Sequence, residues 1–215
     1  MRSRPTESRK PTRQRIELDD GAYCELYTDW LAPDESQAAF SALRSEVPFA
    51  QRAIRMFGRE VLQPRLSAWV GEPEAVYRYS GTTHLPVAFG PQLSALRDRV
   101  CQETGAAFNS VLCNLYRDGN DAMGMHSDNE PELGPLPLIA SLSLGAARRF
   151  QLRRRRGEGS RRARIDLVLE CGSLLVMGGT TQQHYRHGVP REPTVSAPRI
   201  NLTFRLVEQR ARVTG

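Results

Sequence analysis

The sequence predicts a β-rich α+β fold in which about eight strands form a two-sheet jelly roll or a barrel. From residue 111 onward, short segments alternate apolar with polar residues and are separated by Gly, Pro, Asp and Asn. Two segments with helical periodicity precede these strands, and the chain has no internal repeat. Because the helices come first, we expect them to pack on the outside of one sheet.

The first fifteen residues are polar and basic, contain two prolines and show no periodicity. Such a segment cannot bury enough apolar surface to fold by itself. We therefore expect a disordered basic arm over residues 1–15, with folded sequence beginning near Ile16.

A first helix is predicted from Pro33 to about Glu46. Proline suits the first helical position, and Asp34 and Glu35 suit the positive end of the helix dipole. Its apolar stripe would consist of Phe40, Leu43 and Val47.

A second helix is predicted from Pro91 to about Glu103, and Gly105 suits the position that ends it. One face would carry Leu93, Leu96 and Val100. The predicted strands then follow near residues 111–117, 123–128, 138–144, 148–154, 164–169, 173–178, 184–189 and 198–207.

Composition places the chain among globular proteins of one domain. It has 215 residues, 40% of them apolar and 25% charged. The chain contains no run of eighteen apolar residues, so no membrane-spanning helix is predicted. The N-terminus also lacks the apolar stretch of a secretory signal. The four cysteines form no CxxC pair, so we expect free thiols in a reducing compartment. This compartment would be the cytoplasm, with work at the nucleoid in a bacterium, or the nucleus in a eukaryote.

Positive charge is concentrated in two segments. Residues 1–15 hold six Lys and Arg against one acid, and residues 148–164 hold nine arginines against Glu158. The formal net charge of the whole chain is +6. Two dense basic segments favour a polyanion as partner, although a solubilising tail and a solvated hairpin would give the same composition.

Three short sequence patterns indicate residues that could bind a metal ion or a ligand. His126 and Asp128 are two residues apart, so on a strand they would share a face, and a further histidine would complete a two-His-one-carboxylate iron site. His84, His184 and His187 are the candidates for the third ligand.

The second pattern is a strand near the C-terminus. Arg199, Asn201, Thr203 and Arg205 alternate with apolar residues, so one face would carry two guanidiniums, an amide and a hydroxyl. Two arginines on one face suit a dicarboxylate. The third pattern, Asn114 and Tyr116, offers neutral hydrogen-bonding groups on one face of an earlier strand.

The ordered set resembles the AlkB-type Fe(II)/2-oxoglutarate-dependent nucleic-acid dealkylating dioxygenases over about residues 50–207. The matching stretches are NLYRDGNDAMGMHSDNE, SLSLGAARRFQLRRR, GSLLVMGGTTQQHYRHGVP and APRINLTFR. The resemblance implies a double-stranded β-helix core over 111–215. It also implies an N-terminal α/β extension over 16–110 that forms a nucleotide-recognition lid, the whole being one compact domain.

The resemblance also implies residue roles. Iron would be held by His126, Asp128 and His187, whereas His184 would be a structural or surface residue. Arg199 would pair with the far carboxylate of 2-oxoglutarate. The rest of that site would be lined by Asn114, Tyr116, Asn201 and Arg205.

Three further residues would meet the substrate base. Phe57 matches the finger residue that fills the gap left by an extruded base, Tyr79 matches an aromatic that stacks on the base, and Glu130 lies near the base edge. Packing roles for Phe57 and Tyr79, and a solvated loop position for Glu130, are the alternatives. Ser127 and Asn129 stand where the family member compared has an arginine and an acid. Neither residue matches an iron ligand, so we expect a difference only in the groups that support the ligands.

The implied function is DNA repair by oxidative demethylation of 1-methyladenine and 3-methylcytosine, with Fe(II), 2-oxoglutarate and O₂ as the reacting system and formaldehyde, succinate and CO₂ released. We expect the enzyme to be a monomer that has no membrane partner. Its expected partner is alkylated DNA, with RNA as an alternative. A dioxygenase of the same fold acting on RNA, a protein side chain or a small molecule is a second hypothesis. A catalytically silent nucleic-acid-binding module is a third, which the intact ligand set and both arginines oppose.

Overall fold

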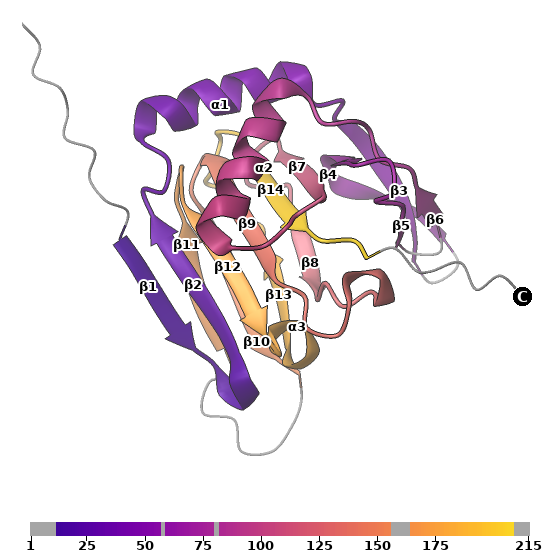
Figure 1. The fold of residues 1–215 in the computed structure, drawn as a ribbon. Coiled ribbons are helices and arrows are strands. Elements are labelled where there is room, and N and C mark those ends of the chain that lie inside the picture. The colour runs from indigo at the N-terminus through magenta and orange to yellow at the C-terminus, as the bar shows by residue number, and fades with distance from the viewer. Residues whose placement is uncertain (1–11, 57–58, 80–81, 156–163, 209–215) are drawn as a thin grey trace, which may run out of the picture.

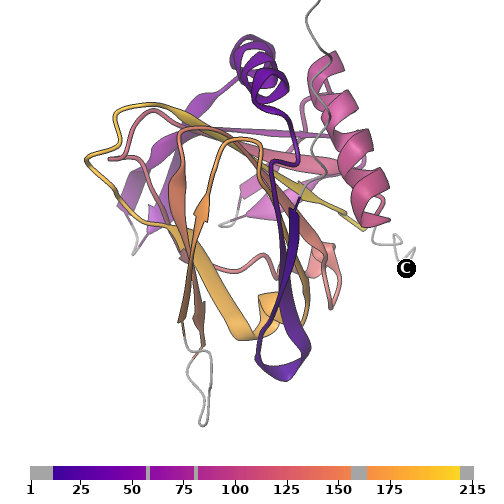
Figure 2. The ribbon, with the colours of Figure 1, turned by 90° about the vertical axis from the view of Figure 1, so that its left-hand side faces the viewer.

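The computed structural model describes residues 12–56, 59–79, 82–155 and 164–208. Their strands form an eight-stranded sheet, a four-stranded sheet and a small two-stranded sheet. None of the helices in this part of the chain is long and apolar enough to cross a membrane. The two larger sheets face each other, so the predicted jelly roll is confirmed (Figures 1 and 2).

The strands of the C-terminal half are distributed between both sheets. The larger sheet takes four of them, β7 (Ser110–Tyr116), β9 (Ile139–Gly145), β12 (Leu174–Gly179) and β14 (Arg199–Arg205). The smaller sheet takes the other four, β8 (Met123–His126), β10 (Arg148–Arg154), β11 (Arg164–Leu169) and β13 (Tyr185–Val189). All eight strands fall within two residues of the predicted bounds.

The N-terminal part adds strands to both edges of the larger sheet. One edge receives β1 (Thr12–Glu17) and β2 (Ala22–Thr28), and the other receives β4 (Arg59–Gly71) and β3 (Ala50–Met56). The short strands β5 (Tyr77–Tyr79) and β6 (Thr82–His84) form the two-stranded sheet. The sequence patterns missed all of these strands, of which β1 to β4 continue the same sheet as the C-terminal half.

The prediction that the disordered arm extends to residue 15 is wrong for its last four residues, because β1 begins at Thr12. Arg13 and Arg15 each donate to Oε1 of the buried Glu25 at 2.8 Å. Their guanidiniums also lie over the rings of Tyr27 and Tyr23. Pairing with β2 and this shared carboxylate let a basic segment form an edge strand. Residues 1–11 lie outside the described part of the chain.

Both predicted helices are present, α1 (Pro33–Glu46) and α2 (Pro91–Thr104). Gly105 ends α2 with φ +71°, a conformation that favours glycine. The Glu46 carboxylate at the end of α1 accepts hydrogen bonds from the main-chain N–H groups of Gln92 and Leu93, both at 3.0 Å. One carboxylate therefore caps the positive end of α2 and joins the two helices.

Two apolar clusters lie on opposite faces of the larger sheet. The outer cluster contains the apolar stripes of α1 and α2 together with Leu142, Ile200, Leu202 and Phe204. The inner cluster, between the sheets, contains Tyr116, Phe150, Leu152, Met177 and Tyr185. Figures 1 and 2 show α2 on the side of the larger sheet away from the smaller one. The predicted packing of the helices outside one sheet is confirmed.

This arrangement decides where the polar face of β14 points. Because strand residues alternate between faces, Ile200, Leu202 and Phe204 face the helices. The four polar residues face the space between the sheets, where all of them are buried: Arg199, Asn201, Thr203 and Arg205.

Candidate metal centre and cofactor site

Two histidines are brought together by strand pairing in the smaller sheet. His126 ends β8, and His187 lies directly opposite it on β13. Their ring centroids are 4.3 Å apart, and the rings are tilted by 59°. The imidazoles therefore reach the same space between the sheets.

Asp128 completes the group, although the sequence argument for its position is wrong. The predicted strand over 123–128 ends at His126, so the two ligands do not share a strand face. The Asp128 carboxylate is instead placed by Arg205, whose Nη2 donates to Oδ1 at 2.7 Å. It lies 3.8 Å from Nε2 of His126 and 3.7 Å from Nε2 of His187.

The donor set suits a metal ion. One ligand atom from each of these three residues lies within 4.8 Å of the others. Oδ2 of Asp128 is buried and has no hydrogen-bond partner among the described residues. Two imidazoles and a carboxylate on one side of an ion leave positions open on the other side, the arrangement of non-haem Fe(II) oxygenases.

The ionisation states also suit a metal. Burial, together with the nearby His126, lowers the pKa of His187 to about 3, so its imidazole is neutral and can donate a lone pair. Burial would raise the pKa of Asp128, but the Arg205 guanidinium and the two imidazoles hold it below its usual range. The site therefore presents one carboxylate anion beside a neutral nitrogen ligand.

Each imidazole is held in a different way. The Nδ1 of His126 is 2.9 Å from the carbonyl oxygen of Gly124, so its N–H can donate there and leave Nε2 free for a metal. The ring of His187 stacks on Phe150, with centroids 5.4 Å apart and an angle of 26°. Phe150 was not among the predicted site residues, because an apolar strand residue gives no chemical signal in a sequence.

His184 does not join the set. The main-chain N–H of His184 donates to Thr180 at 3.1 Å and its carbonyl accepts from Arg155 at 2.7 Å, both as part of the local backbone. The side chain of His84 lies outside the described part of the structure. Of the three candidates for the third ligand, the described structure brings only His187 to His126 and Asp128.

A buried cation lies on the interior face of the larger sheet, on the polar side of β14. Arg199 is 1% exposed, and its Nη2 donates to Ser143 Oγ at 2.9 Å. Its Nε and Nη1 have no hydrogen-bond partner among the residues the structure describes. Burial lowers the pKa of Arg199, which is the cost of a guanidinium withdrawn from water. Such a group is satisfied best by an anion that arrives from outside the chain.

The pairing of β7 with β14 places the other predicted cofactor-binding residues on the strands around Arg199. Tyr116 of β7 lies opposite Arg199, with its ring centroid 5.2 Å from the guanidinium carbon, and Asn114 lies opposite Asn201. Asn114 accepts from Nε of Arg65 at 2.7 Å, which leaves its own Nδ2 without a partner among the described residues. The Asn201 amide is already bonded to Ser141 Oγ at 2.8 Å.

The two arginines of β14 have different surroundings. The sequence interpretation treated them as a pair for one dicarboxylate, but Arg205 has its carboxylate in Asp128. Arg199 and Arg205 are six residues apart, roughly 20 Å along a strand. Arg199 is therefore the cation available to a ligand, and Arg205 supports the metal-binding carboxylate.

Arg148 is a further buried arginine that sequence reasoning assigned only to the basic hairpin. It donates to the carbonyl oxygens of Asp118, Asp121 and Pro190 at 2.7–3.1 Å and to Glu192 at 3.2 Å. These bonds join the loop before β8 to the loop after β13. Its guanidinium also lies over the Tyr116 ring, 5.6 Å from the centroid.

The substrate residues implied by the resemblance are placed less fully. Phe57 lies outside the described residues, between β3 and β4 in the sequence; these two strands pair, with Met56 opposite Arg59. Tyr79 ends β5, and its side chain also lies outside the described structure. Glu130 follows the ligand segment, and its buried Oε2 has no partner among the described residues.

Two hollows flank the ligand segment. A small one of about 20 Å³ is lined by the three metal-site residues together with Tyr116, Asn201 and Arg205. A larger one of about 420 Å³ is lined by Asn129, Gln182, Gln183 and Glu208, among others. We assign the metal and cofactor site to the smaller hollow. Of these two hollows, it is the one whose lining brings the titratable metal ligands together.

Comparison with known proteins gives a family. Residues 23–205 match the model of the 2OG-Fe(II) oxygenase superfamily. The human alpha-ketoglutarate-dependent dioxygenase alkB homolog 3 is 41% identical over 188 residues, which are 85% of this chain and 65% of the human protein. The mouse DNA oxidative demethylase ALKBH2 is 40% identical over 195 residues, 87% of this chain and 81% of the mouse protein.

The solved structure of OsALKBH1 has a TM-score of 0.64 and 17% identity, and the match covers 90% of this chain and 99% of that one. This likeness concerns the fold. The chain spans just under two thirds of the alkB homolog 3 proteins, 65% of the human and 62% of the bovine protein.

Proposed function

The chain belongs to the 2OG-Fe(II) oxygenase superfamily and, within it, to the AlkB-type dioxygenases, and from this we propose that it removes N-linked methyl groups from bases in nucleic acid. The single observation that carries the proposal is that a two-His-one-carboxylate group and a buried, partly unsatisfied arginine lie in the same space between the two sheets. The names of the relatives, a DNA oxidative demethylase among them, support DNA repair as the purpose.

The residues have separate tasks in this proposal. Fe(II) would be held by His126, Asp128 and His187, and the far carboxylate of 2-oxoglutarate would be bound by Arg199. When bound, Fe(II) and 2-oxoglutarate would supply the oxidation by O₂: 2-oxoglutarate would lose CO₂ and take one oxygen atom to become succinate, and the other oxygen atom would hydroxylate the methyl group, which would leave as formaldehyde. Asn114, Tyr116 and Asn201 would orient the cofactor.

The substrate is a base lifted out of its stack, because the methyl groups of 1-methyladenine and 3-methylcytosine lie on the Watson–Crick edge. We propose that the N-terminal strands β3 to β6 form the nucleotide-recognition lid, with Phe57 filling the gap and Tyr79 stacking on the base. Glu130 is proposed to face the base edge, which agrees with its unpaired buried oxygen among the described residues. The four cysteines are unpaired, in support of a reducing, cytoplasmic location.

Mass spectrometry of methylated oligonucleotides tests this function. After incubation with Fe(II), 2-oxoglutarate and O₂, 1-methyladenine and 3-methylcytosine should lose their methyl groups, with formaldehyde and succinate released in equal amounts. Single-stranded DNA, duplex DNA and RNA carrying one lesion each would separate the substrate classes. Consumption of 2-oxoglutarate without loss of methyl groups from any of them would instead favour a hydroxylase acting on another substrate.

An arginine row on the outer face of the smaller sheet supports a nucleic-acid partner. Arg153 of β10 lies directly opposite Arg164 of β11 and Arg186 of β13, and all three are exposed. Arg164 is paired with Asp166, whereas no ion pair to a described residue holds Arg153 or Arg186. Like charges opposite each other are destabilising unless an anion lies between them. Arg156 and the hairpin tip fall outside the described residues.

Neutralising this row should weaken nucleic-acid binding in a salt-dependent way. We expect Arg153→Gln with Arg186→Gln to reduce duplex affinity and to flatten the plot of log affinity against log salt by about one unit per lost phosphate contact. Arg44→Gln is the matched control, because Arg44 lies on α1 against Phe40, over the larger sheet. Equal salt slopes for the double variant and the wild type would remove the row from the binding surface.

Phe57→Ala should distinguish duplex from single-stranded substrates. Extruding a base from a duplex costs a few kcal/mol of stacking and pairing and leaves a gap, whereas a single strand has no such gap. We therefore expect the variant to lose far more activity on a methylated duplex than on the same lesion in single-stranded DNA. Equal losses on both substrates, measured side by side with the wild type, would make Phe57 a packing residue.

A further inference from the structure

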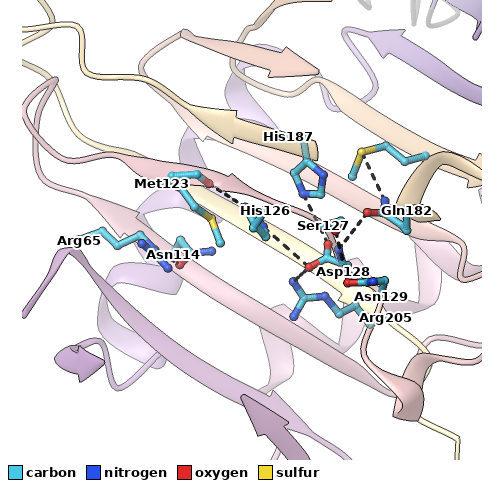
Figure 3. A network of polar contacts seen from close by, with 12 residues as sticks. Arg65, Asn114, Met123, His126, Ser127, Asp128, Asn129, Gln182, His187 and Arg205 are labelled. Atoms are coloured by element: carbon cyan, nitrogen blue, oxygen red, sulfur yellow. Dashed lines mark hydrogen bonds and ion pairs between the residues drawn. The ribbon is translucent and has the colours of Figure 1, made fainter. Parts of the chain in front are cut away.

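The amide of Gln182 reaches the ligand segment close to the metal site. Its Oε1 accepts a hydrogen bond from the main-chain N–H of Asp128 at 3.0 Å, and the side chain is buried (Figure 3). Only the oxygen of an amide can accept from an N–H group, so this contact fixes which way the amide points. Gln182 was not among the residues that the sequence patterns indicated.

Asp128 depends on such a contact because the strand does not hold it. The ladder of β8 ends at His126, so no sheet hydrogen bond fixes the backbone at residue 128. Two side-chain contacts hold it instead, Arg205 on the carboxylate and Gln182 on the main chain. Figure 3 shows the two contacts converging on Asp128. Together they fix both the position and the orientation of the carboxylate.

Gln182 is itself held firmly. It lies in the short helix α3 (Thr181–His184), between β12 and β13. Thr181 Oγ1 donates to the carbonyl oxygen of Gly178 at 2.6 Å and accepts from the N–H of Tyr23 at 3.1 Å, which anchors α3 to two strands. Nε2 of Gln182 lies 3.8 Å from Sδ of the buried Met177. Five residues later the same segment supplies His187.

We propose that Gln182 is a positioning residue of the metal centre, which holds the Asp128 backbone so that its carboxylate meets the two imidazoles. The inference rests on the proposed function, because it assigns a metal to the three residues. Groups that orient metal ligands from behind change metal affinity by about 10- to 100-fold when they are lost. Without Gln182, the Asp128 N–H would be left buried and unpaired, and the segment would turn to find another acceptor.

Metal binding by the apoprotein, with all 215 residues present, tests this role without any turnover. We would titrate Co(II) anaerobically into the wild type, Gln182→Met, Gln182→Glu and Gln183→Met, recording affinity by calorimetry and ligand geometry by the visible d–d spectrum. Gln182→Met keeps the size of the side chain but removes the acceptor, and Gln182→Glu keeps an oxygen that can accept. Gln183→Met is the matched control, since Gln183 turns outward and donates to the carbonyl of Pro135 at 2.8 Å.

We expect Gln182→Met to bind Co(II) about 10-fold or more weakly and with an altered spectrum, and Gln182→Glu and Gln183→Met to resemble the wild type. Wild-type affinity and spectrum in Gln182→Met would overturn the role of Gln182 while leaving the metal centre intact. Absence of Co(II) binding in the wild type would overturn the centre itself. If Gln182→Met does not fold, the Co(II) affinity of Gln182→Glu tests the proposal instead. This variant keeps an acceptor oxygen, so weak Co(II) binding by it would also contradict the proposal.

Discussion

Alanine in place of His126, Asp128 or His187 is expected to reduce demethylation below detection, because a site with three protein ligands has none to spare. The three donor atoms lie within 4.8 Å of one another, and no other described His, Cys, Asp or Glu joins them. The measurement is methyl loss from an oligonucleotide, together with the metal content of each purified variant. Circular dichroism would show that the histidine variants keep the fold.

His184→Ala is the matched control for the two histidine variants. Its side chain is part of no described metal group, and the hydrogen bonds it makes to other described residues come from the main chain. We expect this variant to keep most of its activity. An inactive His184→Ala beside an active His187→Ala would show that the third ligand is misassigned.

Asp128 needs a second variant because it also neutralises Arg205. Removing one partner of a buried ion pair costs about 3–5 kcal/mol, since the other charge is left uncompensated. Asp128→Ala should therefore lower thermal stability more than either histidine variant does. Asp128→Asn keeps the shape of the side chain, and its loss of activity would report on the missing carboxylate charge.

Arg199→Ala is expected to raise the KM for 2-oxoglutarate far more than that for the oligonucleotide. A lost charge-assisted bidentate pair is worth about 2–4 kcal/mol, which corresponds to about 30-fold to several-hundred-fold in affinity. Nε and Nη1 of Arg199 have no hydrogen-bond partner among the described residues, and Nη2 keeps one N–H besides the one it donates to Ser143, so two neighbouring N–H groups are left for that pair. Steady-state kinetics with each substrate varied in turn would measure the split.

A stability measurement separates this binding role from a structural one. A buried guanidinium without a carboxylate costs folding free energy, so Arg199→Met should leave the cofactor-free protein no less stable than the wild type. It should at the same time lose the rise in Tm that 2-oxoglutarate gives. An unchanged dependence on 2-oxoglutarate in either variant would remove Arg199 from the cofactor site.

Local patterns were sufficient for much of the fold. Helix α1 has the predicted bounds, because Pro33, the two acids after it and the apolar spacing all indicate the same element. The alternation over β14 predicted correctly that one face is apolar and the other polar. The N-terminal strands were missed, since β1 and β3 carry arginines and glutamines that do not alternate with apolar residues.

The sequence by itself determined which residue types could bind a metal and an anion, and the ordered set from Asn114 to Arg205 was enough to indicate the family. Only the tertiary structure decided how those residues are held. Asp128 lies beyond the end of its strand and takes its position from Arg205 and Gln182, which are 77 and 54 residues away along the chain. The same long-range packing left Arg199 without a carboxylate among the described residues and gave Arg205 one, although the two arginines occupy equivalent positions in the pattern. Alternation along a strand states only which face a side chain occupies, whereas its partner is set by the segments that the fold brings to that face.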